Sequence, residues 1–324
     1  MADKHEKGVR SKLIWLIPAI IIVLLVIAGV AVYFSFFTSS TEEATLHVES
    51  GSVQVFRSNS WVSGTEGMQL KENDRIKTGD GEASVILYES IIIALEKNTE
   101  ISLKQLSESN PSVKVESGST WHKFTKLTGV EGYDVETPTT VATVRGTEFE
   151  VDYFPELDES QILVGEGTVD VSADGEKQQV SADEKITRSA KNKLQKSKLT
   201  PEEKAKVQAK ILKNIERLKL LREREISKNK KLIDMARSQY KFTDQDIKDA
   251  LADIDIGKLD DNELIAKSPV KTASIGKIKK INDEIKKQMN YAETAGVDKE
   301  KIINYVRGQL TDADSLRDKL NSTR

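Results

Sequence analysis

The sequence predicts a membrane-anchored α+β protein, with a single amino-terminal transmembrane helix, an all-β unit of the roll or sandwich type, and an α-helical carboxy-terminal region. Three observations predict it. A long run near the amino terminus carries no charge, the middle of the chain alternates apolar and polar residues, and the last third shows apolar steps of three and four residues. The expected segments are a cytoplasmic tail at 1–12, a transmembrane helix at 13–37, a β unit at 44–187, a basic linker at 188–199 and a charged helical region at 200–324.

The composition limits the chemistry. The 324 residues include no cysteine, which excludes disulfides, thiolate metal sites and cysteine nucleophiles. The net charge of −3 is unevenly distributed, because residues 38–199 hold 17 basic and 28 acidic groups whereas residues 200–324 hold 28 basic and 22 acidic groups. An acidic middle is therefore joined to a basic tail.

The uncharged run at 13–37 is long enough to cross a bilayer. A helix of this length spans roughly 37 Å, against a hydrocarbon core of about 30 Å. A cleaved signal peptide is the competing interpretation, but its apolar core would be shorter and would end in small residues, whereas this run ends in bulky aromatic ones. Four basic residues precede the run and acidic ones follow it, so we expect the amino terminus inside the cell and the bulk of the chain outside.

The acidic middle has the pattern of half-buried strands. Apolar residues alternate with polar ones, as in Val53 and Val55 or Val169 and Val171, and turn residues recur about every ten positions. Residues 84–95 are almost continuously apolar, and we expect them to form central strands buried on both faces. The all-β interpretation rests on these features together.

An internal repeat supports a closed β unit. The octapeptide VESGSVQV at 48–55 recurs as VESGSTWH at 115–122 and as VGEGTVDV at 164–171. Each copy predicts a strand, a glycine turn and a second strand. The spacing of the copies is too uneven for an open solenoid.

The segment TPTTVATVRGTEFEV at 137–151 resembles the most characteristic stretch of the FecR-like domain, and NDRIKTGDGEASVIL at 73–87 and VGEGTVDV at 164–171 are similar to two further segments of that family. The resemblance implies an extracytoplasmic β structure. It marks the following residues as a family signature: Thr137, Pro138, Val144, Arg145, Gly146, Thr147 and Phe149.

Arg145 and Gly146 form the strongest candidate site within this signature. An arginine beside a glycine could bind a carboxylate or phosphate. In the alternative that we favour, Gly146 permits a sharp bend and Arg145 satisfies a local carboxylate or carbonyl groups at the end of a strand.

Other candidate sites lack the required spacing. His47 and His122 fall on different predicted strands, and the acidic residues near Asp80 lack the alternating register of a calcium loop. Gly165 and Gly167 precede no helix, so they do not predict a phosphate-binding loop. We therefore expect no catalytic residues, no cofactor and no metal.

The tail begins with a strong helix signal, in which Thr200 caps the helix and Pro201 takes its first position. An apolar stripe follows that needs a partner, either within this chain or in another protein. It consists of Val207, Ile211, Ile215 and Leu218. The stripe gives way to charges over 222–231. Further helices are expected at 242–254, 277–295 and 298–320, with a loop at 257–275.

Residues 188–240 carry 17 basic and 6 acidic groups. This surface could bind an anionic envelope polymer, another envelope protein or lipid headgroups, or it could dock on the acidic β unit of the same chain. Nucleic acid is not expected, since aromatic stacking residues are nearly absent. The sequence as a whole favours a non-enzymatic, membrane-anchored binding or assembly module. The alternative is a transmembrane signal regulator, which a cytoplasmic segment of about twelve residues makes less favourable.

Overall fold

The structure is a computed structural model that describes residues 44–125, 127–190, 192–228, 273–294, 297–298 and 302. The expected cytoplasmic tail at 1–12, the transmembrane helix at 13–37 and the helix at 242–254 lie outside these residues, as does most of the helix at 298–320. Neither described helix, α2 (Pro201–Lys228) or α6 (Ala273–Thr294), is long and apolar enough to cross a membrane. The membrane anchor stays a prediction.

Sixteen strands form two sheets, which we call sheet A and sheet B, and β8 (Ser112–Phe124) belongs to both. Sheet A contains, in spatial order, β1 (Ala44–Ser50), β5 (Glu82–Leu87), β6 (Ile91–Leu95), β8, β11 (Glu148–Phe154), β12 (Glu159–Glu166), β15 (Glu184–Ser189) and β16 (Gln195–Lys198). Sheet B contains β3 (Ser60–Ser63), β2 (Val53–Arg57), β4 (Arg75–Thr78), β7 (Glu100–Gln105), β8, β9 (Tyr133–Glu136), β10 (Val141–Val144), β13 (Thr168–Ala173) and β14 (Glu176–Ser181). Apart from the parallel β8–β9 pair, these neighbours are antiparallel, which confirms the predicted all-β unit.

The long strand β8 crosses from one sheet to the other. Its first part pairs with β7 and β9, and its second part pairs with β6 and β11. Gly118 lies at the crossing with φ of +88°, where a Cβ atom would stand 2.5 Å from the Oγ1 atom of Thr99. Only glycine fits this position, because both the backbone angle and the close approach exclude a side chain.

The three repeat copies mark crossings between the sheets. The first and third copies have the predicted strand, glycine turn and second strand, but the turn joins β1 of sheet A to β2 of sheet B, and β12 of sheet A to β13 of sheet B. The middle copy differs from the prediction, because its strand continues through the glycine as β8. The repeat therefore encodes a corner in the β unit, not a hairpin.

The main core lies between the two sheets and is apolar. Val85 and Ile93 point into it from sheet A, whereas Ile86 and Ile92 on the same strands pack in a second cluster under the helices. The prediction that residues 84–95 are buried on both faces is confirmed, since β5 is buried except at its first residue and β6 throughout.

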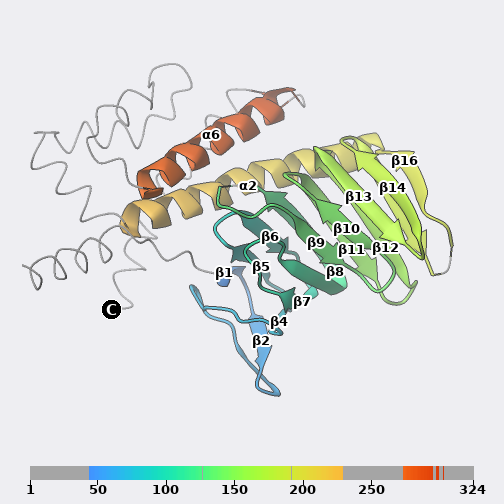
Figure 1. Cartoon of the computed structure of the whole chain (residues 1–324), viewed down its shortest axis with the longest axis horizontal. Helices are drawn as coiled ribbons and strands as arrows, with labels where there is room; N and C mark the ends of the chain where they lie inside the picture. Colours follow the sequence, from blue (N-terminus) through green and yellow to red (C-terminus); the bar gives the residue numbers. More distant parts are fainter. Residues whose placement is uncertain are drawn as a thin grey trace, which may run out of the picture.

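Helix α2 covers the outer face of sheet A, and α6 lies along α2 (Figure 1). Helix α2 begins with a capping box. The Thr200 Oγ1 accepts a hydrogen bond from the amide of Glu203, and the Glu203 carboxylate accepts one from the amide of Thr200. Helix α2 continues to Lys228, through residues 222–228, where we expected the apolar stripe to give way to charges. The charged residues at this end of the helix still contact the β unit, because Arg224 and Lys228 form ion pairs with its acidic residues.

The basic linker predicted at 188–199 is wrong. Residues 188 and 189 end β15, and residues 195–198 form β16, which pairs with β15. Arg188 is buried, so its charge did not indicate a solvated linker. The predicted helix at 277–295 is confirmed as α6, which begins four residues earlier.

Candidate functional site

The face between α2 and sheet A combines apolar contacts with ion pairs. The stripe predicted as a partner-binding face is fully used there, with Val207 at 5% exposure and Ile211, Ile215 and Leu218 at 0%. These side chains pack with apolar residues of sheet A and of α6. The sequence left open whether the stripe meets its own chain or another protein, and the structure assigns it to its own chain. It is not available to an outside partner.

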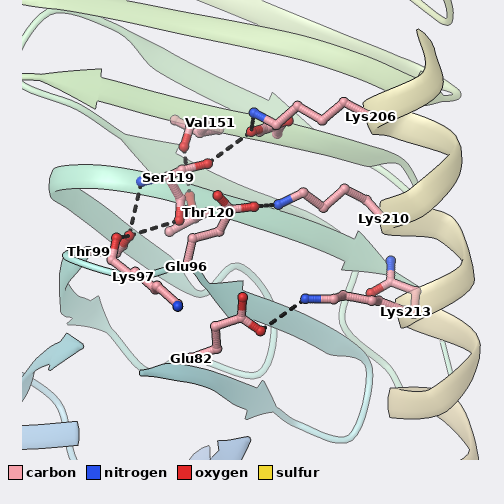
Figure 2. A network of polar contacts seen from close by, with 12 residues as sticks. Glu82, Glu96, Lys97, Thr99, Ser119, Thr120, Val151, Lys206, Lys210 and Lys213 are labelled. Atoms are coloured by element: carbon pink, nitrogen blue, oxygen red, sulfur yellow. Dashed lines mark hydrogen bonds and ion pairs between the residues drawn. The ribbon is translucent and has the colours of Figure 1, made fainter. Parts of the chain in front are cut away.

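Basic side chains of α2 pair with acidic side chains along the β unit. In Figure 2, Lys206, Lys210 and Lys213 extend from one side of the helix toward sheet A, where Lys213 meets Glu82 at 3.0 Å and Lys210 meets Glu96. The basic helix α2 at the start of the tail therefore docks on the acidic middle of the same chain, one of the alternatives that the charge distribution allowed. Five further pairs join the same two regions: Lys204–Asp183, Lys206–Glu150, Arg217–Glu49, Arg224–Glu66 and Lys228–Glu89.

A buried ion cluster joins four elements, β8, β11, β12 and α6, on this face. Lys123 of β8 is 2% exposed and lies 3.2 Å from Glu148, 2.8 Å from Glu166 and 2.8 Å from Glu284 of α6. Burial alone would lower the pKa of Lys123, but the three carboxylates outweigh it and raise the pKa well above its ordinary value. Lys123 is therefore a permanent cation that holds α6 against the β unit.

Glu148 connects the same cluster to α2. Its Oε1 atom accepts hydrogen bonds from the indole of Trp121 at 2.9 Å and from the side-chain amide of Asn214 at 2.6 Å. Asn214 is itself fully buried on α2. A buried carboxylate with this many donors fixes the rotation of the helix, because few rotations satisfy all of them.

Two carboxylates of β11 lie side by side under the first turns of α2. Glu150 and Asp152 share one face of the strand, and Glu150 accepts from Ser119 at 2.9 Å and pairs with Lys206. Burial, and next the Glu150 charge, raise the pKa of Asp152 to about 7. Asp152 therefore retains its proton up to near neutral pH.

The first strand of the β unit is tied to the second half of α2. Arg217 donates to both carboxylate oxygens of Glu49, at 2.7 and 3.0 Å, and this pairing lowers the pKa of Glu49 although burial alone would raise it. Arg224 donates to Glu66 at 3.1 Å, and His47 Nδ1 lies 2.6 Å from the same carboxylate. A groove of about 400 Å³ opens beside these residues, between β1 and α2.

Five of the seven family-signature residues have a structural role. Val144 and Phe149 belong to the inter-sheet core, Thr147 is buried, and Gly146 turns the chain between β10 and β11 with φ of +87°. Pro138 is exposed. The predicted sharp bend at Gly146 is confirmed.

Thr137 organises the turn before β10. Its Oγ1 atom accepts from the amides of Thr139 and Thr140 and lies 2.7 Å from the hydroxyl of Ser160. This network orders the T-P-T-T turn by hydrogen bonds within the protein.

The structural role expected of Arg145 belongs to another arginine. Arg145 is exposed, and no described residue forms a side-chain hydrogen bond or ion pair with it, so the prediction that it satisfies local acceptors is wrong. Arg188 performs that role, donating to the carbonyl of Thr139, to the carbonyl of Asn192 and to Asp174. Arg145 points outward because the corner places it on the solvent face.

His122 lies in the core between the two sheets. His122 is buried, with Nδ1 3.0 Å from the hydroxyl of Tyr133 and its ring stacked 4.9 Å from Phe149, and burial lowers its pKa to about 3. It is thus a neutral core residue. Within the residues that the structure covers, no group of three or more acidic or histidine side chains could hold a metal ion.

We call the contact surface of α2 and α6 with sheet A the docking face. Sequence reasoning missed the polar residues that form it, above all Lys123, Glu148 and Asn214. On β11 the alternation of Glu148, Glu150 and Asp152 with apolar residues is the ordinary signal of a solvated face. The one signal that could have found them is the opposite charge of this strand face and of the amphipathic helix that follows.

Part of the β unit is similar to a known protein family. Residues 74–170 match the family described as FecR protein, a stretch that runs from the start of β4 into β13. No curated protein matches the sequence.

Two crystal structures of a protein from Parabacteroides distasonis ATCC 8503, described as a "putative anti-sigma factor" and determined at 2.50 and 1.65 Å resolution, are also similar. Each shares 18% identity with a TM-score of 0.35, over 38% of this chain and 59% of theirs. The chain therefore spans little more than half the length of these proteins. The stretch that matches the FecR family lies within a larger two-sheet β unit.

Proposed function

We propose that this chain is a non-enzymatic, single-pass membrane protein that displays the β unit, α2 and α6 as one binding or assembly module outside the cell. The observation that carries the proposal is the docking face. The apolar stripe and the cations of α2 bind the β unit, so the two regions present themselves as one body. The FecR domain, which occurs in extracytoplasmic β structures in the family that the sequence resembles, supports the location.

The module needs a partner surface other than the α2 stripe. Because many cations of α2 are paired with the β unit, this helix offers little free charge for an anionic envelope polymer. Another envelope protein that binds the β unit is the partner we propose, with the membrane bilayer as the anchor. No nucleic acid is proposed, for the same reason.

Topology is tested with single cysteines, which the cysteine-free chain allows without background. Ser39→Cys and Ser322→Cys should react with a membrane-impermeant maleimide on intact cells, and Ala2→Cys should react only after lysis. The lysed sample is the control for reactivity at all three positions. Labelling of Ala2→Cys alone on intact cells would reverse the orientation and remove the extracytoplasmic assignment.

A transmembrane signal regulator is the second candidate, and one observation favours it. Strand β1 follows the predicted membrane helix closely, and Arg217 and Arg224 of α2 hold the β1 side of the β unit through Glu49 and Glu66. A change in α2 could therefore reach the membrane.

The two candidates differ in what they require of the amino terminus. Replacing residues 2–9 with a neutral linker should leave the partners recovered from detergent-solubilised membranes unchanged if the chain is a module. Loss of the cellular function in that variant, with partners still bound, would favour the regulator.

A further inference from the structure

The β2–β3 hairpin is the part of the β unit that projects from sheet B at the end away from α2 and α6, where β2 is labelled in Figure 1. Ser58 and Asn59 form its two-residue loop, both with positive φ, as in the tight turns that match the twist of paired strands. All four residues of β3 are exposed, including Trp61 at 38% and Val62 at 41%. The hairpin lies outside the stretch that matches the FecR family.

Four strands end the two sheets, and three of their edges are protected. The edge of β1 is covered by residues 67–70, through backbone bonds such as that from the amide of Leu46 to the carbonyl of Met68 at 2.9 Å. The edge of β14 is crossed by side-chain bonds to residues 194–196. Strand β16 carries Lys196 and Lys198, and edge lysines disfavour pairing with another chain.

Strand β3 has none of these protections. It contains no charge, proline or bulge, it pairs with β2 alone, and no other described residue bonds to its backbone. Natural proteins suppress such edges unless they are used, since a free edge with apolar side chains pairs readily with an added strand.

The outer face beside β3 is aromatic and cationic. The Trp61 ring lies 5.3 Å from Phe56, and the guanidinium of Arg75 lies 5.6 Å from the Trp61 ring centroid. Arg75 and Lys77 are 44% and 51% exposed and share the carboxylate of Glu100, which is only 12% exposed and lies beneath them. The surface layer therefore has surplus positive charge within reach of a strand added to β3.

We propose that the β3 edge binds an extended, acidic segment of a partner protein, which adds to sheet B as a further strand. Its backbone pairs with β3, its apolar side chains contact Trp61 or Val62, and its acidic side chains on the outer face meet Arg75. This inference rests on the proposed function, since it names the surface and the class of partner of the binding module. The binding itself does not depend on the orientation of the chain in the membrane.

The test uses the full chain in detergent micelles and a defined probe, a fluorescein-labelled octapeptide that alternates glutamate and valine. Fluorescence anisotropy should show saturable binding. Replacing the glutamates by lysines should weaken binding at least tenfold, and a central proline, which cannot donate a backbone hydrogen bond, should weaken it as much. Hydrogen exchange should slow at residues 60–63 when the peptide is bound.

Val62→Lys on the protein should weaken binding at least tenfold, whereas Leu157→Lys, at an apolar residue that is 65% exposed elsewhere, should leave it unchanged. Equal thermal unfolding of the two variants confirms that both fold. Binding that survives Val62→Lys, or that shows no protection at residues 60–63, overturns the proposal. So does no measurable binding of the peptide.

Two further measurements test other occupants of the edge. Sedimentation equilibrium that shows dimers in the parent chain, lost in Val62→Lys, would assign the edge to a second copy. Binding of an anionic polysaccharide such as hyaluronate in place of the peptide would assign the face to a polymer. Either result overturns the peptide proposal and leaves the topology experiment untouched.

Discussion

Sheet A has two packed faces that differ in chemistry. The inner face, against sheet B, is almost entirely apolar, and its polar members include the neutral His122 and, near one end, the charged Arg188. The outer face, against α2 and α6, combines an apolar cluster with buried charges, including Lys123 and Glu148. Strand β8 thus contributes to both faces, with His122 on the inner face and Lys123 on the outer face.

The difference teaches what each layer contributes. Apolar burial is non-directional and stabilises by area, at about 25 cal/mol per Å². Buried ion pairs add little net stability, because desolvation offsets their attraction, but they penalise every arrangement that leaves a charge without a partner. We infer that the inner layer stabilises the β unit and that the outer layer selects one position for the helices.

The largest expected effect comes from breaking the outer layer at its apolar stripe. Ile211→Asp with Leu218→Asp places two carboxylates at fully buried positions, which should cost more than about 5 kcal/mol and detach α2 and α6. Limited proteolysis should then cut both helices. The β unit should still unfold cooperatively, because its inner core is unchanged.

A matched control keeps the same charge change on the exposed side of α2, with Ala205→Asp and Ala209→Asp. This variant should keep the protease resistance of the parent. Loss of the β unit together with the helices in the first variant would show that the two layers fold as one.

The next effect comes from removing the cation at the centre of the outer layer. Lys123→Met leaves Glu148, Glu166 and Glu284 close together without their shared partner, and we expect a loss of about 3–5 kcal/mol in urea unfolding. Lys114→Met, at the partly exposed pair with Glu116, should cost less than about 1 kcal/mol. Equal losses would contradict the importance we give to burial.

A smaller effect depends on pH and comes from Asp152, which lies in the outer layer. Because the pKa of Asp152 rises from 3.8 to about 7 on folding, its contribution to stability is fully present below pH 4 and is lost as the pH rises to about 7. The loss is at most about 4 kcal/mol. Asp152→Asn should therefore gain stability relative to the parent as the pH rises from 4 to 7, with no further gain above pH 8.

Chemical denaturation at several pH values measures this difference. Asp170→Asn, on the exposed face of β13, is the control and should follow the parent at every pH. A constant difference between Asp152→Asn and the parent would show that Asp152 titrates normally in the folded protein.

The smallest effect is expected at the corner of the family signature. Arg145→Ala should change stability by less than about 0.5 kcal/mol, because the side chain is exposed. Arg188→Ala should cost about 1–3 kcal/mol, because it leaves buried acceptors such as the carbonyl of Thr139 without a donor. Thermal unfolding of the two variants decides which arginine supports the turn, and a larger loss in Arg145→Ala would reverse our assignment.

Much of the fold could be predicted from the sequence, because the signals are local. Alternation at Val53 and Val55 depends only on neighbouring residues of one strand, and the Thr200 capping box depends on four consecutive residues. The glycines of the repeat were recognised as turns for the same reason. Only the middle copy failed, since a glycine bend inside a strand and a glycine turn between strands have the same local pattern.

The candidate site could be predicted only in part. The stripe at Ile211 and Ile215 showed that α2 has a partner but could not show which, because an apolar face is equally satisfied by its own chain or by another. Arg145 and Arg188 have the same chemistry in the sequence. Which of them is buried depends on the corner at Gly146 and on the path of β15.

The sequence by itself determined the strands, the turns, the start of α2 and the opposite charges of the β unit and the tail, since these follow from backbone preferences and composition over a few residues. Only the tertiary structure decided that the charges meet each other. Arg217 and Glu49 are 168 positions apart, and their pairing requires β1 and α2 to be placed by the whole β unit between them. An ion pair acts over a few ångströms, so a sequence can supply both charges without specifying that they touch.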